Sequence, residues 1–448
     1  MGRGFCDGDS GTEDVLRVGV PPDRPEMNGS STIVAIIGPG EGHAVVRASG
    51  LADAGLDVVV VPLTPWKGAD PRIRVVDVRV SRGGASPFRL FKLPFYLLDL
   101  ILRIRAVKAD VYYVHFAGDI HAWMTWILGK RPFAVMVMGG DVLFDEQFDP
   151  SRWSRWLTQR TLREADLVTV KSNFLGDVVR RFGVDGERIH RVIWGVDTTR
   201  FRPQEPGEIR NELGLDGEGP VLLSPKIVRP FYNIDWIIEA VGQVRVDFPS
   251  VRLIILEHEP DLAYLNYLRD LVGKLGLESS VRFVPPVPND RMVELYSVVD
   301  IVVGIPESDG LPTSLFEAMA CGVPHVLADL DRYREVVEDG ETAILVLPGV
   351  DSLAAGIRRI LGDDELRRRI SRAGRTRVQD VADFTEECRR VQKLLAGLVG
   401  TWRRSSIGAR VLASAVVGVE CMEFLVRRPA GRVRDIEIPG RAARTDPG

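Results

Sequence analysis

The chain has 448 residues, of which 45% are hydrophobic and 27% charged, a composition typical of a globular protein with two or three domains and not of a disordered or fibrous one. Its 58 Lys and Arg against 62 Asp and Glu give a net charge of −4, which argues against a nucleic-acid partner. No run approaches the roughly 20 apolar residues that cross a bilayer, and the 4 cysteines lie far apart, as in reduced cytosolic proteins.

Residues 1–30 are rich in Gly, Asp and Pro and are expected to be a disordered lead-in without a secretory signal. Ordered structure is predicted to begin with a β-branched strand over 32–37. A glycine-rich turn over 38–42 follows, then a helical pattern over 43–54 and a second buried strand over 56–61. Strand, glycine-rich turn, helix and strand are typical of the first unit of a doubly wound parallel sheet.

Further apolar runs continue this alternation and predict two Rossmann-like domains, one over 31–201 and one over 202–385, with C-terminal helices and a basic tail over 386–448. In the first domain the remaining strands are predicted at 111–114, 133–138, 167–170 and 191–193. In the second they are predicted at 221–224, 252–256, 281–284, 301–304, 325–328 and 343–346. The predicted fold class is α/β, with two doubly wound domains facing a central cleft, because open parallel sheets bind ligands at the carboxyl ends of their strands.

The segment 309–324 carries the strongest chemical signal. A strand leads into a loop with a carboxylate and a glycine, and a helix is expected to begin at Thr313 or Ser314. Free N–H groups at a helix start favour an anion, and glycine allows close backbone approach. Asp309 and Glu317 bracket that helix start, which suits a nucleotide-sugar with hydroxyls at both ends and phosphate between. The alternative is that Asp309 caps the helix and Glu317 lies on a solvated face.

The same segment resembles the E-x7-E motif of family 4 retaining glycosyltransferases, the glycosyl transferases group 1 of the GT-B fold. The usual form is E-G-[FL]-[GP]-x-x-x-x-E-A-M-A-x-G-x-P, and Asp309 stands here for the first Glu. The resemblance implies that Asp309 contacts the donor sugar and Glu317 the ribose. It places Gly310, Leu311 and Pro312 beside the diphosphate and sugar.

A second segment, 224–235, lies where this family places the basic pair that binds the donor diphosphate. Lys226 then substitutes for the usual Arg, and Arg229 supplies the second charge. Tyr232 and Asn233 replace a Lys-Gly pair, which puts Asn233 on the donor side. The alternative is an ordinary basic pair on the surface.

Several segments of the N-terminal half resemble family elements on the acceptor side of the cleft. Segment 137–141 matches V-H-G-x-D with Met138 in place of His, and 192–203 resembles the domain junction. A tight turn explains the glycine-rich loop equally well, and a structural role explains His115 equally well. The residues assigned to the acceptor side or the cleft are Gly38, Gly40, His115, Gly139, Gly140, Asp141 and Lys171.

The basic stretch 71–131 holds eleven Lys and Arg against four Asp, interleaved with apolar residues. Such a stretch favours either peripheral contact with an anionic membrane or an ordinary basic surface beside a buried helix. The short D-x-D sequences at 7–9 and 329–331 arise easily by chance, and the family resemblance implies neither a metal nor another cofactor.

The expected function is therefore transfer of a sugar, with retention of configuration, from a nucleotide-sugar to a hydroxyl acceptor such as a lipid-linked one. Polysaccharide, glycolipid or cell-envelope glycan synthesis in the cytoplasm, at the inner face of the membrane, is the expected setting. The alternatives are a GT-B scaffold that binds a nucleotide-sugar or a partner without turnover, and a phosphorylase or epimerase on the same fold. An Ala at position 317 is expected to abolish transfer and leave the fold intact.

Overall fold

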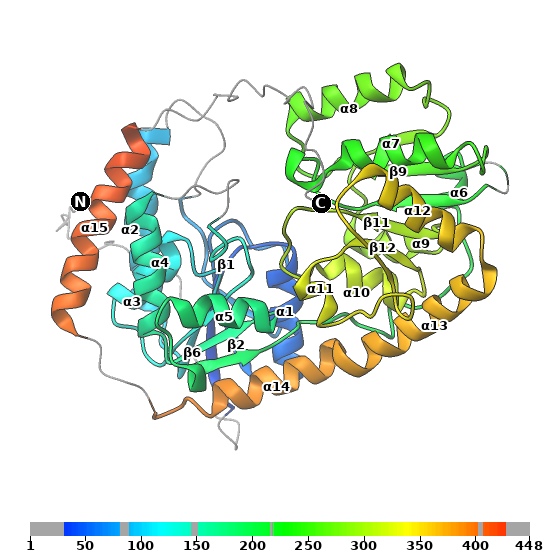
Figure 1. The fold of residues 1–448 in the computed structure, drawn as a ribbon. Coiled ribbons are helices and arrows are strands. Elements are labelled where there is room, and N and C mark those ends of the chain that lie inside the picture. Colours follow the sequence, from blue (N-terminus) through cyan, green and yellow to red (C-terminus); the bar gives the residue numbers. More distant parts are fainter. Residues whose placement is uncertain are drawn as a thin grey trace, which may run out of the picture.

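The computed structural model describes residues 31–80, 89–144, 151–215, 217, 219–401 and 406–426. The expected lead-in, the D-x-D at 7–9 and the basic tail lie outside the described residues. Figure 1 shows two α/β lobes side by side, each with a sheet between layers of helices.

The first lobe contains a seven-stranded parallel sheet of order β3-β2-β1-β4-β5-β6-β7. Its strands are mostly runs of Val, Ile and Leu, because both faces of the sheet are buried beneath helices. In chain order its elements are β1 (Ile33–Gly38), α1 (His43–Asp53), β2 (Asp57–Pro62), β3 (Arg74–Val75), α2 (Arg89–Ala106), β4 (Val111–His115), α3 (Ile120–Ile127), β5 (Phe133–Met136), α4 (Arg152–Glu164), β6 (Leu167–Val170), α5 (Asn173–Arg181), η1 (Gly186–Arg188) and β7 (Ile189–Arg191).

The strands predicted from the sequence differ from those of the structure at the two edges of this sheet. It predicts six strands, and the structure adds β3, whose two residues are too short for an apolar pattern. The last strand covers 189–191 instead of 191–193. Val192 and Ile193 are buried by the packing of the domain junction, so their apolar character does not mark a strand.

The second lobe contains a six-stranded parallel sheet of order β10-β9-β8-β11-β12-β13. All six strands predicted for this domain are present. Its elements are α6 (Ile209–Glu212), β8 (Val221–Ser224), η2 (Pro230–Tyr232), α7 (Ile234–Val244), β9 (Arg252–Leu256), α8 (Leu262–Lys274), β10 (Val281–Val284), η3 (Asn289–Arg291), α9 (Met292–Tyr296), β11 (Ile301–Gly304), α10 (Thr313–Ala320), β12 (His325–Ala328), α11 (Asp331–Arg334), β13 (Ile344–Val346), α12 (Val350–Leu361) and α13 (Asp364–Val381).

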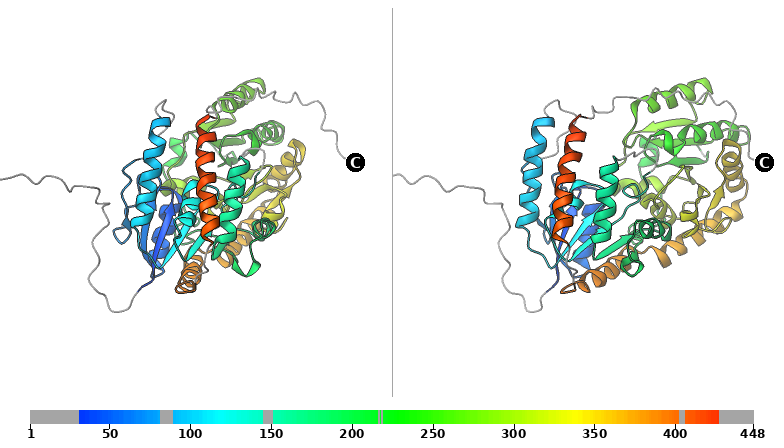
Figure 2. Two further views of the ribbon diagram at one scale, coloured as in Figure 1. Left: turned by 90° about the vertical axis from the view of Figure 1, so that its left-hand side faces the viewer. Right: turned by 60° about the vertical axis from the view of Figure 1, so that its left-hand side comes forward.

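The chain then returns to the first lobe through α14 (Phe384–Ala396) and α15 (Ile407–Val426), as Figure 1 shows. Helix α14 buries Cys388 and Val391 against the core beneath α1, and α15 buries Ala413 in the core beneath α3. Glu420 of α15 accepts a hydrogen bond of 2.6 Å from Ser154 at the start of α4. The left view of Figure 2 shows α15 standing beside α2 and α4 on the outer face of the lobe. Among the described residues, every helix is too short or too polar to span a bilayer.

The chain passes between the two lobes twice, and the two connecting segments contact each other. Val196 pairs with Asp383 in an isolated bridge, and Val196 N donates to Ala382 O over 2.9 Å. A Cβ on Gly195 would lie 1.5 Å from Ala382 O, so this junction requires glycine.

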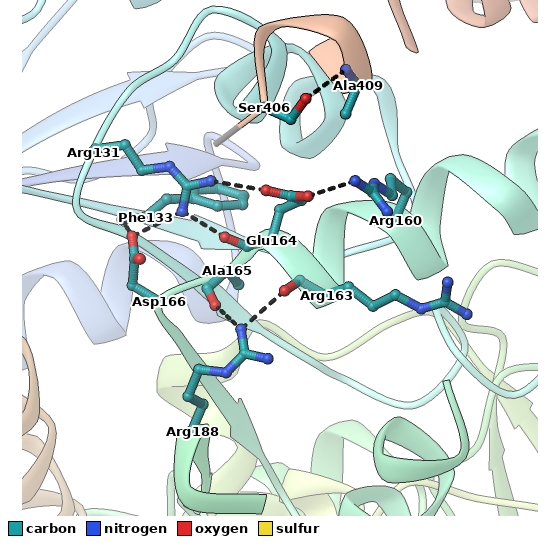
Figure 3. A network of polar contacts seen from close by, with 10 residues as sticks. All are labelled: Arg131, Phe133, Arg160, Arg163, Glu164, Ala165, Asp166, Arg188, Ser406 and Ala409. Atoms are coloured by element: carbon teal, nitrogen blue, oxygen red, sulfur yellow. Dashed lines mark hydrogen bonds and ion pairs between the residues drawn. The ribbon is translucent and has the colours of Figure 1, made fainter. Parts of the chain in front are cut away.

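Charged side chains stabilise the amino ends of β5 and β6, away from the carboxyl ends. Arg131, before β5, contacts Asp166, before β6, over 2.9 Å, and it also contacts the Glu164 carboxylate over 3.5 Å (Figure 3). Arg188 donates to the backbone carbonyls of Arg163 and Ala165. This network joins the strand ends opposite the site described below.

Candidate functional site

A cavity of about 170 Å³ lies between the two domains. The first domain contributes residues that follow β5 and β6, and the second contributes residues that follow β8 and β11. The cavity therefore lies at the carboxyl ends of both sheets, where ligands bind in this kind of fold. Its lining residues are Met138, Gly140, Leu143, Lys171, Phe231, Tyr232, Ser308, Asp309, Gly310, Leu311 and Pro312.

The Asp309 carboxylate is the centre of a polar cluster in this cavity. Its Oδ2 contacts Nζ of Lys226 and accepts a hydrogen bond of 2.8 Å from the Tyr333 hydroxyl, and its Oδ1 accepts one of 2.6 Å from Gly310 N. Burial acts to raise the pKa of Asp309, but these partners outweigh it and hold the pKa below its usual range. Asp309 is therefore ionised at neutral pH and pairs with Lys226.

The loop after Asp309 is held in an unusual conformation that presents the start of α10. Leu311 is buried with a φ of 60°, a region that costs a non-glycine residue about 1–2 kcal/mol. Helix α10 begins at Thr313, with Pro312 as the N-cap and no side-chain cap. Asp309 is thus not the helix cap, and the first N–H groups of α10, those of Thr313 and Ser314, lack a side-chain acceptor.

Glu317 lies one turn further along α10 and is buried, so it is not on a solvated face. Its Oε2 accepts a hydrogen bond of 3.1 Å from the Tyr296 hydroxyl. Burial raises the pKa of Glu317, while Tyr296, Arg200 and Asn289 act in the opposite direction. Glu317 does not line the cavity beside Asp309 but lies deeper, against α9 and η3.

The other two residues assigned to the donor from segment 224–235 lie near Lys226 but are engaged elsewhere. Asn233 has a φ of 49° and donates from its side-chain amide to Ile305 O over 2.9 Å, which joins the start of α7 to the end of β11. The guanidinium of Arg229 is 3.8 Å from the Glu259 carboxylate and is not among the lining groups.

On the first domain, Asp141 holds the loop that carries Gly139 and Gly140. One of its oxygens accepts from the backbone N–H groups of Met138 and Gly139, and the other accepts from Ala117 N, over 2.8–3.0 Å. With 2% of its surface exposed, Asp141 orients this loop and has no carboxylate oxygen free for a ligand.

The remaining acceptor-side residues surround this loop. His115 ends β4 and is buried beside Arg47 of α1. Gly38 and Gly40 leave room for neighbouring chain, since a Cβ would lie 2.7 Å from His115 Cβ and 2.2 Å from Thr64 O respectively. Lys171 spans the cleft, with Nζ 3.3 Å from Leu311 O.

Further contacts hold the domains together across the cleft. Glu335, after α11, accepts hydrogen bonds from Asn173 N and Phe174 N at the start of α5, over 2.7 and 2.9 Å. The guanidinium of Arg332 lies 4.7 Å above the Phe174 ring. These contacts hold the start of α5 in the first domain against the α11 region of the second.

The sequence analysis missed the lining residues Leu143 and Ser308, and it also missed three polar residues that contact the site: Arg47, Tyr296 and Tyr333. The two tyrosines come from α9 and α11, which the strand and loop motifs do not include. Arg47 follows the glycine-rich loop by one helical turn, and its charge inside an otherwise apolar buried face of α1 is the signal that could have identified it.

Gly310→Ala is expected to reduce catalysis and also to lower stability. A Cβ there would lie 2.7 Å from Met138 O on the opposite domain, so the domains must separate slightly. A displacement near 1 Å at a reaction centre can cost about a hundredfold in rate. Gly207→Ala is the matched control, because its Cβ meets no atom within 4 Å. Turnover and melting temperature of both variants check this, and wild-type turnover by Gly310→Ala would contradict it.

Two Rossmann-like domains facing one cleft, with the site at the strand ends of both, define the GT-B class of glycosyltransferases. The sequence model described as Glycosyltransferase Family 4 matches residues 40–200, and the one described as Glycosyl transferases group 1 matches residues 206–377. The chain belongs to this glycosyltransferase family and is a transferase enzyme.

Curated relatives agree with this assignment, and solved structures share the fold. A D-inositol 3-phosphate glycosyltransferase of Acidothermus cellulolyticus is 28% identical over 66% of this chain and 71% of its own length. One from Rhodococcus jostii is 31% identical, but the match covers 42% of this chain and less than half, 43%, of that relative. Sucrose-phosphate synthase from Thermosynechococcus elongatus superposes with a TM-score of 0.71 at 20% identity, over 82% of this chain and 99% of that one. Anabaena HepE in complex with UDP and glucose gives 0.67 at 17% identity, over 82% and 100%.

Proposed function

We propose that this glycosyltransferase moves a sugar from a nucleotide-diphosphate sugar to a hydroxyl acceptor with retention of anomeric configuration. The observation that carries the proposal is the Asp309–Lys226–Tyr333 cluster beside the uncapped start of α10. The solved structure of HepE with UDP and glucose supports a nucleotide-sugar donor on this fold.

The charge of each group indicates which part of the donor it would bind. Lys226 and the N–H groups of Thr313 and Ser314 would bind the diphosphate and stabilise the negative charge that develops as it leaves. Asp309, oriented by Tyr333, would accept hydrogen bonds from the sugar hydroxyls, and Glu317 would accept them from the ribose. The scheme includes no metal ion or other cofactor, because Lys226 and the N–H groups at the start of α10 would supply the positive charge for the diphosphate.

The carboxylates near the cavity support retention, because neither of them is placed to take the proton from the acceptor hydroxyl. Asp309, the one acid among its described lining residues, lies on the donor side beside Lys226. Asp141 has both oxygens bonded to backbone N–H groups, and Met138 stands where the V-H-G-x-D motif has a His. The leaving diphosphate itself would then take the acceptor proton, on the same face from which the acceptor attacks.

The setting proposed is glycolipid, polysaccharide or cell-envelope glycan synthesis in the cytoplasm, on the inner face of a membrane. Helix α2 supports it, because Phe95 and Leu98 are 64% and 53% exposed within a basic stretch. Co-sedimentation with anionic vesicles but not with neutral ones is the expected result, and equal recovery with both would refute membrane contact.

The transfer reaction is tested with UDP-, GDP- and ADP-sugars and a panel of hydroxyl acceptors. We expect one nucleotide class to raise the melting temperature, its sugar to be transferred or slowly hydrolysed, and NMR of the product to show the donor's anomeric configuration. Inversion would refute the mechanism. Binding without any turnover would instead support the scaffold alternative, which the Met138 substitution favours.

A further inference from the structure

Arg47 is a buried cation of the first domain that lies behind Met138, a lining residue of the cavity. It projects from α1 with 4% of its surface exposed. Its Nη1 lies 3.3 Å from Sδ of Met138, which lines the cavity, 3.1 Å from Sδ of Met136 and 3.3 Å from Nδ1 of His115. The guanidinium carbon lies 4.9 Å from the centre of the Trp194 ring. None of these contacts carries a negative charge.

Other buried arginines of the same domain are paired with acids. Arg103 donates to Asp99 over 2.8 Å, and Arg131 is paired with Asp166 and Glu164. Arg47 has no carboxylate within ion-pair distance among the described residues. A buried charge is costly unless it is paired, so a guanidinium kept here without an acid indicates that its counter-charge comes from outside the chain.

Lys171 is a second cation of this kind, and it lines the same cavity with 7% of its surface exposed. Its hydrogen bond within the described residues is to Leu311 O, a neutral acceptor. The two nearby acids are already engaged: Asp141 by backbone N–H groups, and Asp309 by Lys226 and Tyr333. Burial, and after it the charge of Arg47, lowers the pKa of Lys171 to about 7, while Asp309 and Asp141 act in the opposite direction.

We propose that Arg47 and Lys171 form an anion subsite, so that the acceptor sugar or polyol carries a phosphate or carboxylate group. The inference rests on the proposed function and names the substrate class for the acceptor side of the same cleft. Both cations belong to the first domain, whereas the groups assigned to the donor diphosphate, Lys226 and the start of α10, belong to the second. The anion on the acceptor neutralises the two cations and orients the attacking hydroxyl, as guanidinium groups do with planar or tetrahedral oxyanions.

The test separates the two subsites by saturating the donor side with UDP and then titrating inorganic phosphate or glucuronate. In the wild type we expect phosphate or glucuronate to raise the melting temperature further, because a ligand that binds the native state stabilises it. Arg47→Met and Lys171→Met are expected to weaken this second binding about 10- to 100-fold. Arg47→Lys is expected to retain part of it, since the charge remains.

Arg72→Met is the matched control, an exposed arginine of the same domain paired with Asp53 and Asp70. Its response to both ligands is expected to equal that of the wild type. The shift caused by UDP in each variant shows that the protein is folded and that the donor side is intact. Methionine at 47 preserves contact with its apolar neighbours.

Each outcome decides between defined alternatives. No second shift in the wild type, or an equal shift in Arg47→Met, overturns the anion subsite while the glycosyltransferase proposal stands. No shift with any nucleotide refutes the proposed function instead. A loss by Arg47→Met confined to UDP-glucuronate, compared with UDP-glucose, places the anion on the donor sugar and overturns its assignment to the acceptor.

Discussion

Lys226→Met is expected to lower sugar transfer at least about a hundredfold and to destabilise the fold. The ammonium contacts Asp309, and the lysine and aspartate side chains are 9% and 12% exposed. Removing the cation takes away the proposed counter-charge of the diphosphate and leaves a buried carboxylate with Tyr333 and Gly310 as its partners. Breaking a buried ion pair from one side costs about 3–5 kcal/mol. Steady-state turnover and denaturant unfolding measure the two effects.

The double variant Lys226→Met, Asp309→Asn separates stability from catalysis. With both charges removed, most of the lost stability is expected to return, because no unpaired carboxylate remains. Transfer is expected to stay low, since neither the diphosphate nor the sugar keeps its charged partner. A double variant with restored turnover would show that the pair is structural and would remove the main support for the proposed site.

The acid limb of the stability curve provides an independent check on the same pair. The folded pKa of Asp309 is depressed, so its contribution to stability is present above its usual pKa near 3.8 and is lost as the pH falls through the depressed value. The double variant lacks this loss. Its free energy of unfolding should therefore fall less steeply than that of the wild type below about pH 4.

The donor half of the cleft was predictable because its residues are close in sequence. The end of β11 at Gly304, a loop and the start of α10 at Thr313 follow one another in the chain, so spacing alone places Asp309 close to Thr313. The contact between Asp309 and Lys226 joins positions 83 apart. The family resemblance assigned both residues to the donor side, but it did not predict that they pair. No sequence pattern identifies Tyr333, whose hydroxyl donates to Asp309.

The acceptor half depends on contacts that no local pattern encodes. Arg47 meets Met138 at a separation of 91 residues, through the packing of α1 on the sheet. The return of α14 and α15 to the first domain is similarly long-range, because amphipathic helices indicate that a face is buried but not against which domain. The sequence therefore predicted the glycine-rich loops correctly as loops, but the tight packing of Gly38 and Gly40 against neighbouring chain appears only in the structure.

Glu317→Gln is the variant in which activity and stability are expected to change in opposite directions. A neutral amide binds hydroxyl groups more weakly than a carboxylate, so transfer should fall about 10- to 100-fold, and Glu317→Ala should abolish it. The fold should persist, because a Gln oxygen can still accept the hydrogen bond from Tyr296. Kinetics with the preferred donor and thermal unfolding measure both changes.

The pH dependence of stability distinguishes the specific loss of the Glu317 carboxylate from general damage to the fold. Burial raises the folded pKa of Glu317, so the stability that the neutral form contributes is present below its usual pKa of 4.5 and is lost as the pH rises through the raised value. Gln cannot ionise, so Glu317→Gln should unfold at a higher temperature than the wild type at pH 8, with the difference disappearing near pH 4. If Glu317→Gln is no more stable than the wild type at pH 8, burial does not destabilise the ionised Glu317 carboxylate. Wild-type transfer by Glu317→Gln would mean that α10 presents no ribose ligand, because the deeper of the two acids would then have no role beyond packing.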